Sequence, residues 1–277
     1  MTDNTLNVYE PIEQYLAALE VPQNLTGLAQ VNYMIQKHLS MFAFSSINVM
    51  LERELPLDIA DIVDRIVVRK QGGYCFEHNK LMQVALAHLG YQVRPILARV
   101  LLDGNEYNRR SHRLTLLTLN SQEYAVDVGF GIGTPREALP LTSQHYQWSQ
   151  THCRLCAIQG QDYRVEQLIL DNWQTMYRFD LSETTEADCD ASHFYTHKFP
   201  QSNFVNNLVV SSIDKDKRLL VKRLELFEYD EHQGSETCSP IRSSEHLFQV
   251  IVHDMGLNFT SEEIEEIFEH QQLKAKS

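Results

Sequence analysis

Apolar residues in the first 90 positions recur with the period of a helix. They return every three or four residues in PIEQYLAALEV, in TGLAQVNYMIQKHLSMF and again in the stretch that follows Cys75. Gly90 is a natural end for the last of these runs, because glycine readily adopts the backbone conformation that closes a helix. The pattern therefore predicts a helical N-terminal part.

From Tyr91 the pattern changes to short runs rich in β-branched and other apolar residues. These runs are YQVRPILARVLL, SHRLTLLTLN, EYAVDVGF and WQTMYRFDL, and HCRLCAIQGQDYRVEQLIL predicts a hairpin around QGQD. Turn-forming DGNEYN and NSQ separate neighbouring runs. Successive strands with little helix between them predict an antiparallel sheet or barrel.

After about residue 190, strands and helices mix. NNLVVSSI and KRLLVKRLELFEYD are strand-like, whereas SSEHLFQVIVHDMG and TSEEIEEIFEHQQLK have helical spacing, and the last begins with a helix start signal. The whole pattern predicts an α+β protein with helices first, an antiparallel sheet in the middle and a mixed C-terminal part.

Acidic residues outnumber basic ones. The 277-residue chain has 24 Lys and Arg against 37 Asp and Glu, which gives a net charge of −13. Nucleic acids and anionic membranes attract basic surfaces, so we expect neither as a partner. The longest uncharged apolar run, LSMFAFSSINVML, is also too short to span a bilayer.

The N-terminus and the cysteines indicate a cytoplasmic protein. The first residues, MTDNTLNVYE, are polar and lack the basic and apolar regions of a signal peptide. Five cysteines are few for a disulfide scaffold in a chain of this length. In a reducing compartment, a free thiol stays available for chemistry.

The stretch QGGYCFEHNK places Cys75 behind two glycines, on the first turn of a predicted helix. Glycines let the backbone turn sharply and bring main-chain N–H groups close to a ligand. The positive end of the helix dipole favours a thiolate, which is the nucleophilic form of cysteine. Taken alone, Cys75 also fits a small inert residue near a turn, as most buried cysteines are.

A cysteine nucleophile needs a base, and the base needs a group that orients it. His112 stands at the head of the predicted strand SHRLTLL, and Asp127 lies inside the apolar run YAVDVGF. An aspartate is costly to bury unless it is paired, and neighbouring antiparallel strands could bring it to the histidine. Each residue alone also fits a simpler role, a solvated histidine or an aspartate at a strand end.

Three motifs in order, GGYCFE, HRL and VDVGFG followed by Pro135, resemble the arylamine N-acetyltransferase family. Weaker matches flank them, namely the N-terminal YL…L helix, the segment from His38 to Phe44, and P-x-S-x-F from Pro200 to Phe204. The resemblance implies three parts: a helical bundle (1–90), an antiparallel β-barrel (91–190) and an α/β lid (191–277). It also implies a cysteine-protease-like Cys-His-Asp site.

The resemblance assigns roles to particular residues. It implies that Cys75, His112 and Asp127 are catalytic, with Glu77 and Asn79 as supports of the turn and helix start. It further implies acetyl-CoA as the acyl donor and no metal. The donor would lie near Ser111, Gly129 and Gly131, and a small aromatic amine, arylhydroxylamine or hydrazine would lie near Phe44, Phe130 and Phe204.

The chain departs from the family pattern at two positions. Gln71 stands where the family often has arginine, and Ser45 stands where it often has glutamate. We infer that the two charges pair in relatives and were lost together, because losing only one would leave a charge without its partner.

Other signals are weaker. HCRLC contains C-x-x-C, but no second pair lies at the spacing of a zinc finger, and the segment is predicted to be a strand whose Cys153 and Cys156 face opposite sides. Two alternatives to the transferase stay open at this point. One is a Cys-His-Asp hydrolase, or an acyl transferase such as a transglutaminase-like enzyme or amide synthase. The other is a binding protein whose triad is idle.

Overall fold

The computed structural model describes residues 6–142, 144–148, 151–169 and 171–275. The polar residues 1–5, part of the stretch in which no signal peptide was expected, lie outside these ranges. Among the described residues, none of the helices combines the length and apolar composition needed to cross a membrane.

The N-terminal part is helical, as predicted. Helix α5 starts at Cys75 and ends two residues before Gly90, which has a φ of +88°. A short strand, β1 (Phe44–Ser45), interrupts the helices. The helices of this part are α1 (Leu6–Leu19), α2 (Gly27–Met41), α3 (Ile47–Met50), α4 (Ile59–Val63) with a π-helical turn (Asp64–Val68), and α5 (Cys75–His88).

The middle part is an eight-stranded, barrel-like antiparallel sheet with the strand order β5-β4-β3-β2-β9-β8-β7-β6. The hairpin predicted around QGQD is present, with Ala157 of β7 opposite Tyr163 of β8. The strands are β2 (Gln92–Val100), β3 (Arg110–Leu119), β4 (Gln122–Val126), β5 (Leu139–Pro140), β6 (Gln144–Trp148), β7 (Thr151–Ala157), β8 (Asp162–Ile169) and β9 (Asn172–Asp180).

The C-terminal part combines a second antiparallel sheet with helices. Its order is β1-β10-β11-β12-β13, so strand β1 from the N-terminal part forms one edge. The remaining strands are β10 (Val209–Ile213), β11 (Lys217–Lys222), β12 (Glu225–Asp230) and β13 (Ser235–Pro240). The helices are α6 (Glu186–Lys198), α7 (Asn203–Asn206), α8 (Ser244–Phe248) with a π-helical turn (Gln249–Asp254), and α9 (Ser261–Ala275).

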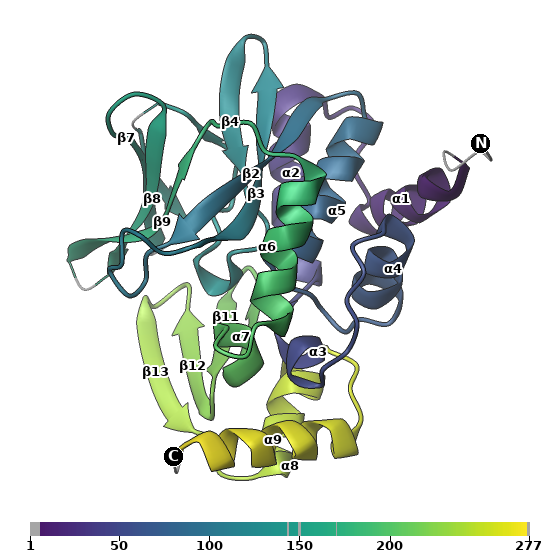
Figure 1. Cartoon of the computed structure of the whole chain (residues 1–277), viewed down its shortest axis with the longest axis vertical. Helices are drawn as coiled ribbons and strands as arrows, with labels where there is room; N and C mark the ends of the chain where they lie inside the picture. Colours follow the sequence, from purple (N-terminus) through teal and green to yellow (C-terminus); the bar gives the residue numbers. More distant parts are fainter. Residues whose placement is uncertain (1–5, 143, 149–150, 170, 276–277) are drawn as a thin grey trace.

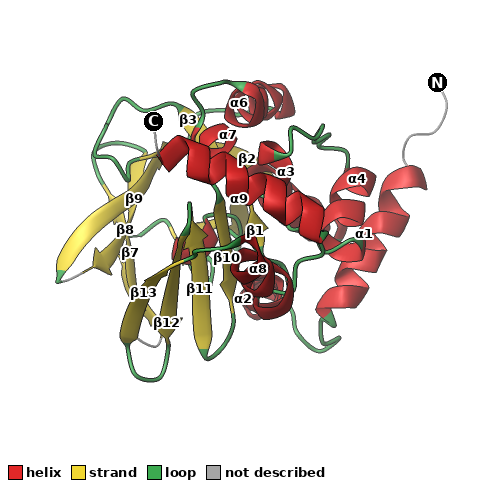
Figure 2. Ribbon diagram, turned by 90° about the horizontal axis from the view of Figure 1, so that it is seen from below, coloured by secondary structure: helices red, strands yellow, loops and turns green. Residues whose placement is uncertain are grey.

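Figure 1 shows the barrel-like sheet beside the N-terminal helices, with the C-terminal sheet and α9 below them. Three hydrophobic cores hold the parts together, and the core of the N-terminal helices also includes Leu97, Leu117 and Val126 of the barrel-like sheet. In Figure 2, α9 crosses one side of the C-terminal sheet, and its Ile264 and Ile267 share a core with Val210 and Val221 of that sheet. The predicted α+β architecture of bundle, barrel and lid is confirmed.

Candidate active site

The loop before Cys75 needs glycine for steric reasons. Gly72 has a φ of +68°, and a Cβ there would lie 2.6 Å from the carbonyl oxygen of Ala43 and 2.8 Å from Cβ of Ser45. The loop therefore packs directly on the segment that contains Ser45. Gln71, the other position that departs from the family pattern, adjoins Gly72 and donates its backbone N–H to the carbonyl of Arg65 at 2.9 Å.

Glu77 fixes the start of α5. One carboxylate oxygen accepts the backbone N–H of Tyr74 at 3.1 Å, which satisfies a donor that the helix leaves unpaired. The other accepts from Nε of Arg65 at 2.7 Å, and both side chains of this ion pair are at most 5% exposed. The supporting role predicted for Glu77 is thus present, whereas the place of Arg65 in the buried pair has no local sequence signal.

Cys75 is the first residue of α5 and is buried. Its thiol lies 3.7 Å from the backbone carbonyl of Ser111, at the start of β3. A hydrogen bond between Cys75 and His112 is among the interactions that favour the charged form of the imidazole. The first turn of α5 and the first residues of β3 thus bring the thiol and the imidazole together.

His112 and Asp127 form a buried pair. Nε2 of the imidazole lies 2.7 Å from Oδ2 of the carboxylate, and the two side chains are 2% and 1% exposed. Burial alone lowers the pKa of His112, but the charge and hydrogen bond of Asp127, with those of Cys75, outweigh it and raise the pKa to about 10. Burial likewise opposes the charge on Asp127, but His112, Asn79 and the Gly129 N–H hold its pKa below the usual value.

Asn79 holds Asp127 in place from the next turn of α5. Its Nδ2 donates to Oδ1 of Asp127 at 2.9 Å and to the carbonyl of Arg113 at 2.6 Å, and its Oδ1 accepts the N–H of Val128 at 2.9 Å. The Gly129 N–H adds a further bond to Oδ1 of Asp127 at 2.9 Å. The support predicted for Asn79 at the helix start is in fact directed at the aspartate.

A β-bulge at Ser111 sets the direction of the histidine. His112 pairs with Ala98 of β2, whereas Arg110 pairs with Arg99, so Ser111 is an extra residue between two neighbouring pairs. A bulge of this kind reverses which face of the sheet the next side chain occupies. His112 therefore points into the barrel-like sheet, and Arg110 shares the outer face with Arg99.

Aromatic side chains surround His112. The ring of Phe130 is 5.0 Å from the imidazole and that of Tyr177 is 4.9 Å away, measured between ring centroids. Tyr177 is fully buried, and burial followed by the charge of Asp127 raises its pKa well above the usual value. Sequence reasoning missed Tyr177, although a tyrosine inside a buried strand is a signal, because its hydroxyl needs a polar neighbour.

Three of the other predicted binding residues, Phe44, Phe204 and Gly131, lie near one another, and Phe204 contacts the residue that precedes Cys75. Phe44 and Phe204 face each other with ring centroids 5.6 Å apart, and Phe204 also lies 5.6 Å from the ring of Tyr74. A Cβ on Gly131 would lie 3.6 Å from the ring of Phe44. The structure thus places Phe44 beside Gly131 and beside Phe204.

Gly129 is required by close packing against α5. A Cβ on this residue would lie 2.8 Å from Cα of Cys75 and 2.8 Å from Nδ2 of Asn79, closer than any side chain allows. The absence of a side chain lets the loop after β4 pack against the helix that carries the thiol.

Within the described ranges, no three His, Cys, Asp or Glu side chains are grouped as metal ligands would be.

The C-x-x-C segment is a strand, as predicted. Cys153 is buried in the barrel-like sheet, whereas Cys156 is only partly buried, in line with side chains on opposite faces of β7. All five cysteines are free.

Comparisons with known proteins agree on one family. A family model described as N-acetyltransferase matches residues 27–264. The arylamine N-acetyltransferase of Escherichia coli (strain K12) is 33% identical over 193 residues, which cover 68% of this chain and 69% of that protein.

Solved structures show the same fold. The arylamine N-acetyltransferase from Salmonella typhimurium has a TM-score of 0.85 at 25% identity, covering 94% of this chain and 98% of that one. The Mycobacterium marinum arylamine N-acetyltransferase in complex with CoA has a TM-score of 0.85 at 24% identity, covering 93% and 98%. With the sequence matches, these likenesses show that the chain is an acetyltransferase and belongs to the arylamine N-acetyltransferase family.

Proposed function

We propose that this enzyme transfers an acetyl group from acetyl-CoA to an arylamine, arylhydroxylamine or hydrazine through an acetyl-Cys75 intermediate. The observation that carries the proposal is the thiol at the start of α5, next to an imidazole that Asp127 holds by its Nε2 atom. The names of the relatives support the acceptor class. A homologous structure in complex with CoA supports the donor.

In the first half-reaction, Nδ1 of His112 takes the thiol proton, because Nε2 is engaged by Asp127. The Cys75 thiolate attacks the thioester carbonyl, and the carbon–sulfur bond to CoA breaks. CoA takes up the proton and leaves as a thiol. Backbone N–H groups of the first turn of α5 would stabilise the oxyanion that forms in between.

In the second half-reaction, the acceptor attacks the acetyl carbon with its nitrogen or, in an arylhydroxylamine, with its hydroxyl oxygen. The bond to the Cys75 sulfur breaks, and a proton passes from the attacking atom to His112. The product is an amide or hydrazide, or an ester where the attacking atom is a hydroxylamine oxygen. The buried carboxylate of Asp127 stabilises the imidazolium in both halves.

The remaining residues have proposed roles around this centre. Ser111, Gly129 and Gly131 would lie along the donor, since the first two adjoin Cys75 directly. Phe44, Phe130 and Phe204 would form apolar walls for the aromatic acceptor. The five free cysteines support a reducing compartment such as the cytoplasm, where Cys75 would stay reduced.

The intermediate can be tested directly. Incubating the full chain with acetyl-CoA and no acceptor should add one acetyl group, found by mass spectrometry of peptides, on Cys75. Adding an arylamine should remove it, and steady-state double-reciprocal plots should be parallel. Cys238, an exposed cysteine, is the internal control. Hydrolysis of the donor without an acetylated Cys75, or intersecting plots, would contradict the proposal.

Replacing Phe130 should separate the two half-reactions. The ring packs against both His112 and Tyr177, with centroids 5.0 and 4.8 Å away, so Phe130→Ala opens space where an acceptor ring would lie. We expect the variant to change the ranking of acceptors while acetylation of Cys75 falls much less. Rates of the two halves, measured separately by stopped flow, check this. Equal loss in both halves would instead assign Phe130 to support of His112.

A further inference from the structure

Three buried side chains connect the N-terminal helices to the loop before Cys75. Tyr15 of α1, His38 of α2 and His78 of α5 are each at most 1% exposed. The hydroxyl of Tyr15 lies 2.7 Å from Nδ1 of His38, and Nε2 of His38 lies 2.8 Å from Nδ1 of His78. The buried chain ends where Nε2 of His78 lies 3.1 Å from the carbonyl oxygen of Gly73. Polar groups from three helices thus reach the backbone two residues before the thiol.

The end of this buried chain fixes the position of every proton in it. A carbonyl oxygen can only accept, so Nε2 of His78 carries a proton and donates to Gly73. In a neutral imidazole the other nitrogen accepts, so Nε2 of His38 donates to Nδ1 of His78. By the same rule, Nδ1 of His38 accepts from the hydroxyl of Tyr15. Both histidines are therefore in the Nε2–H tautomer, and every bond points toward Gly73.

Burial keeps the three groups neutral. It lowers the pKa of His78 to about 4, although two backbone carbonyls and the charge of Asp127 favour the protonated ring. Burial, followed by the neighbouring His78, lowers the pKa of His38 well below its usual value. Burial also raises the pKa of Tyr15 well above its usual value. The neutral arrangement therefore persists at neutral pH.

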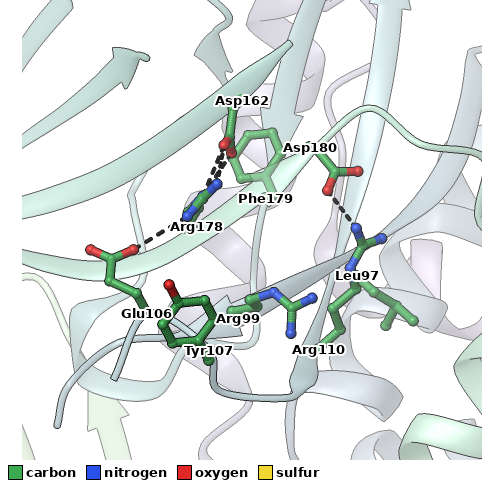
Figure 3. Close-up of a pocket in the computed structure, with 9 residues that line it drawn as sticks. All are labelled: Leu97, Arg99, Glu106, Tyr107, Arg110, Asp162, Arg178, Phe179 and Asp180. Carbon is green, nitrogen blue, oxygen red and sulfur yellow. Dashed lines mark hydrogen bonds and ion pairs between the residues drawn. The ribbon is translucent and has the colours of Figure 1, made fainter. Parts of the chain in front are cut away.

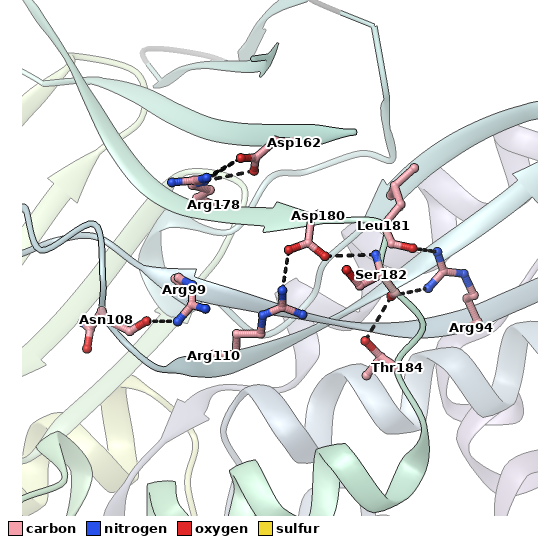
Figure 4. A network of polar contacts seen from close by, with 10 residues as sticks. All are labelled: Arg94, Arg99, Asn108, Arg110, Asp162, Arg178, Asp180, Leu181, Ser182 and Thr184. Atoms are coloured by element: carbon pink, nitrogen blue, oxygen red, sulfur yellow. Dashed lines mark hydrogen bonds and ion pairs between the residues drawn. The ribbon is translucent and has the colours of Figure 1, made fainter. Parts of the chain in front are cut away.

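Polar networks on the outer face of the barrel-like sheet have a different environment. Arg178 pairs there with Asp162 beside a pocket of about 280 Å³ (Figure 3). Arg110 pairs with Asp180 (Figure 4). These four side chains are 20–36% exposed, so water can satisfy them when a partner moves. The buried chain lies instead within the core of the N-terminal helices, where each polar group depends on its partner.

The carbonyl at the end of the buried chain belongs to the peptide that leads into α5. This peptide follows a pair of glycines, whose backbone has little conformational preference of its own. Hydrogen bonds therefore decide how the Gly73–Tyr74 peptide is oriented. Its carbonyl accepts from His78 and from the Ser45 N–H, the latter at 2.6 Å, and its N–H donates to Glu77 at 3.1 Å. His78 supplies one of the two side-chain contacts that hold it.

The neighbours of His78 on α5 have related tasks. Glu77 holds the N–H of the same peptide, and Asn79 holds Asp127. Three successive residues thus fix the entry into the helix and the partner of His112. The sequence position of His78 places it within the part of α5 that organises the site.

We propose that His78 is a positioning residue of the transferase, and that Tyr15 and His38 keep it in the tautomer that holds Gly73. The inference rests on the proposed role of Cys75 as nucleophile. By holding the carbonyl of Gly73, His78 would keep the thiol and the backbone N–H groups of the first turn of α5 directed at the thioester.

The tautomers can be measured directly on the full chain. Nitrogen-15 NMR distinguishes a protonated ring nitrogen from one with a lone pair, and His38→Gln and His78→Gln assign the signals. We expect both rings to be neutral Nε2–H tautomers from about pH 6 to about pH 8. Tyr15→Phe removes the donor to Nδ1 of His38, so the preference of that ring for one tautomer should weaken.

Two substitutions of His78 separate hydrogen bonding from packing. His78→Gln keeps a donor for Gly73 and an acceptor for His38, whereas His78→Leu keeps only apolar bulk. We expect His78→Leu to lower the rate of Cys75 acetylation by acetyl-CoA roughly tenfold or more, because a small displacement of a reacting group is costly. His78→Gln should recover most of that rate. Tyr15→Phe, which changes the core least, should lower the rate in the same direction but by less.

Control variants test for general effects. Arg94→Gln removes a side chain that donates to the carbonyls of Leu181 and Ser182, outside the candidate active site (Figure 4). His88→Leu repeats the change from His to Leu at an exposed position at the end of α5. Both should be acetylated at the wild-type rate, and thermal transitions would show that each variant is folded.

Several results would overturn the proposal. One is an Nδ1–H tautomer or a protonated ring for His78 at neutral pH in the wild type. Another is a folded His78→Leu protein that is acetylated at the wild-type rate. Equal loss in His78→Leu and His78→Gln would show that the ring acts by packing. Failure of the proposed function is recognised separately, by the absence of acetyl-Cys75 in the wild type, because the tautomers are measured without acetyl-CoA.

Discussion

Asp127→Asn is expected to lower acetylation of Cys75 by roughly a hundredfold or more at neutral pH, as removal of a triad aspartate does elsewhere. The reason lies in the tautomer of His112. Oδ1 of residue 127 would still accept the hydrogen bonds that Asn79 and Gly129 donate. The new amide NH₂ would therefore face Nε2 of His112. An amide donor there forces Nε2 to accept, so the ring proton moves to Nδ1. The nitrogen that should take the thiol proton is then already protonated.

The loss of the carboxylate charge adds to this effect. Asp127 is the main group that raises the pKa of His112 against burial, so without it the buried imidazolium is disfavoured. The pH profile for alkylation of Cys75 by iodoacetamide should therefore move to higher pH. Asp103→Asn, the same change on the exposed connection after β2, is the control. A folded Asp127→Asn protein with the wild-type alkylation profile would refute the thiolate–imidazolium pair.

Elements with a strong hydrophobic period could be predicted from the sequence, and elements without one could not. The helix after Cys75 and strands β2 and β3 bury a continuous apolar pattern, and they are present as predicted. Helix α6 has few apolar positions, so its periodicity was too weak to detect. Its start could have been found, since Thr185 and Asp188 cap each other across the first turn.

Strand β13 and the hairpin before it show the same limit. Ser235–Pro240 is an edge strand that is mostly exposed, so it carries no alternation of apolar and polar residues. KRLLVKRLELFEYD was predicted as one strand-like stretch and forms the hairpin of β11 and β12. Arg223 in its turn has a φ of +58°, although arginine is not a typical residue for that conformation.

Some residues of the candidate site could likewise be predicted from the sequence, and others could not. The sequence order of Cys75, His112 and Asp127 is visible in short motifs, because each lies beside glycines or within an apolar strand. Tyr177 and Arg65 have no such motif. Both enter the site through tertiary contacts, which bring Tyr177 to His112 and Arg65 to Glu77.

Breaking the buried pair of Arg65 and Glu77 should lower the free energy of unfolding more than any other single change around the thiol. Arg65→Met leaves the carboxylate of Glu77 buried without its cation, and breaking a buried pair costs about 3–5 kcal/mol of unfolding free energy. Adding Glu77→Gln removes the stranded charge while keeping an oxygen for the Tyr74 N–H, so the double variant should be more stable than Arg65→Met alone.

Arg69→Met provides the matched control for this prediction. Arg69 pairs with Asp64 at 2.7 Å in the same segment, but both side chains are about half exposed, so its loss should cost less than about 1 kcal/mol.

The pH dependence distinguishes a stranded charge from lost packing. Burial raises the pKa of Glu77, and Arg65 opposes that rise, so in Arg65→Met the folded pKa should rise further. The native state then binds a proton more readily than the unfolded chain. The loss of unfolding free energy should accordingly be small near the ordinary Glu pKa of about 4.3 and should grow as pH rises toward the folded pKa.

Urea unfolding at about pH 5 and about pH 8 measures this difference. A penalty that is equal at both pH values, or a double variant no more stable than Arg65→Met, would show that Arg65 acts by packing and by its bond to the carbonyl of Pro56, not by neutralising Glu77.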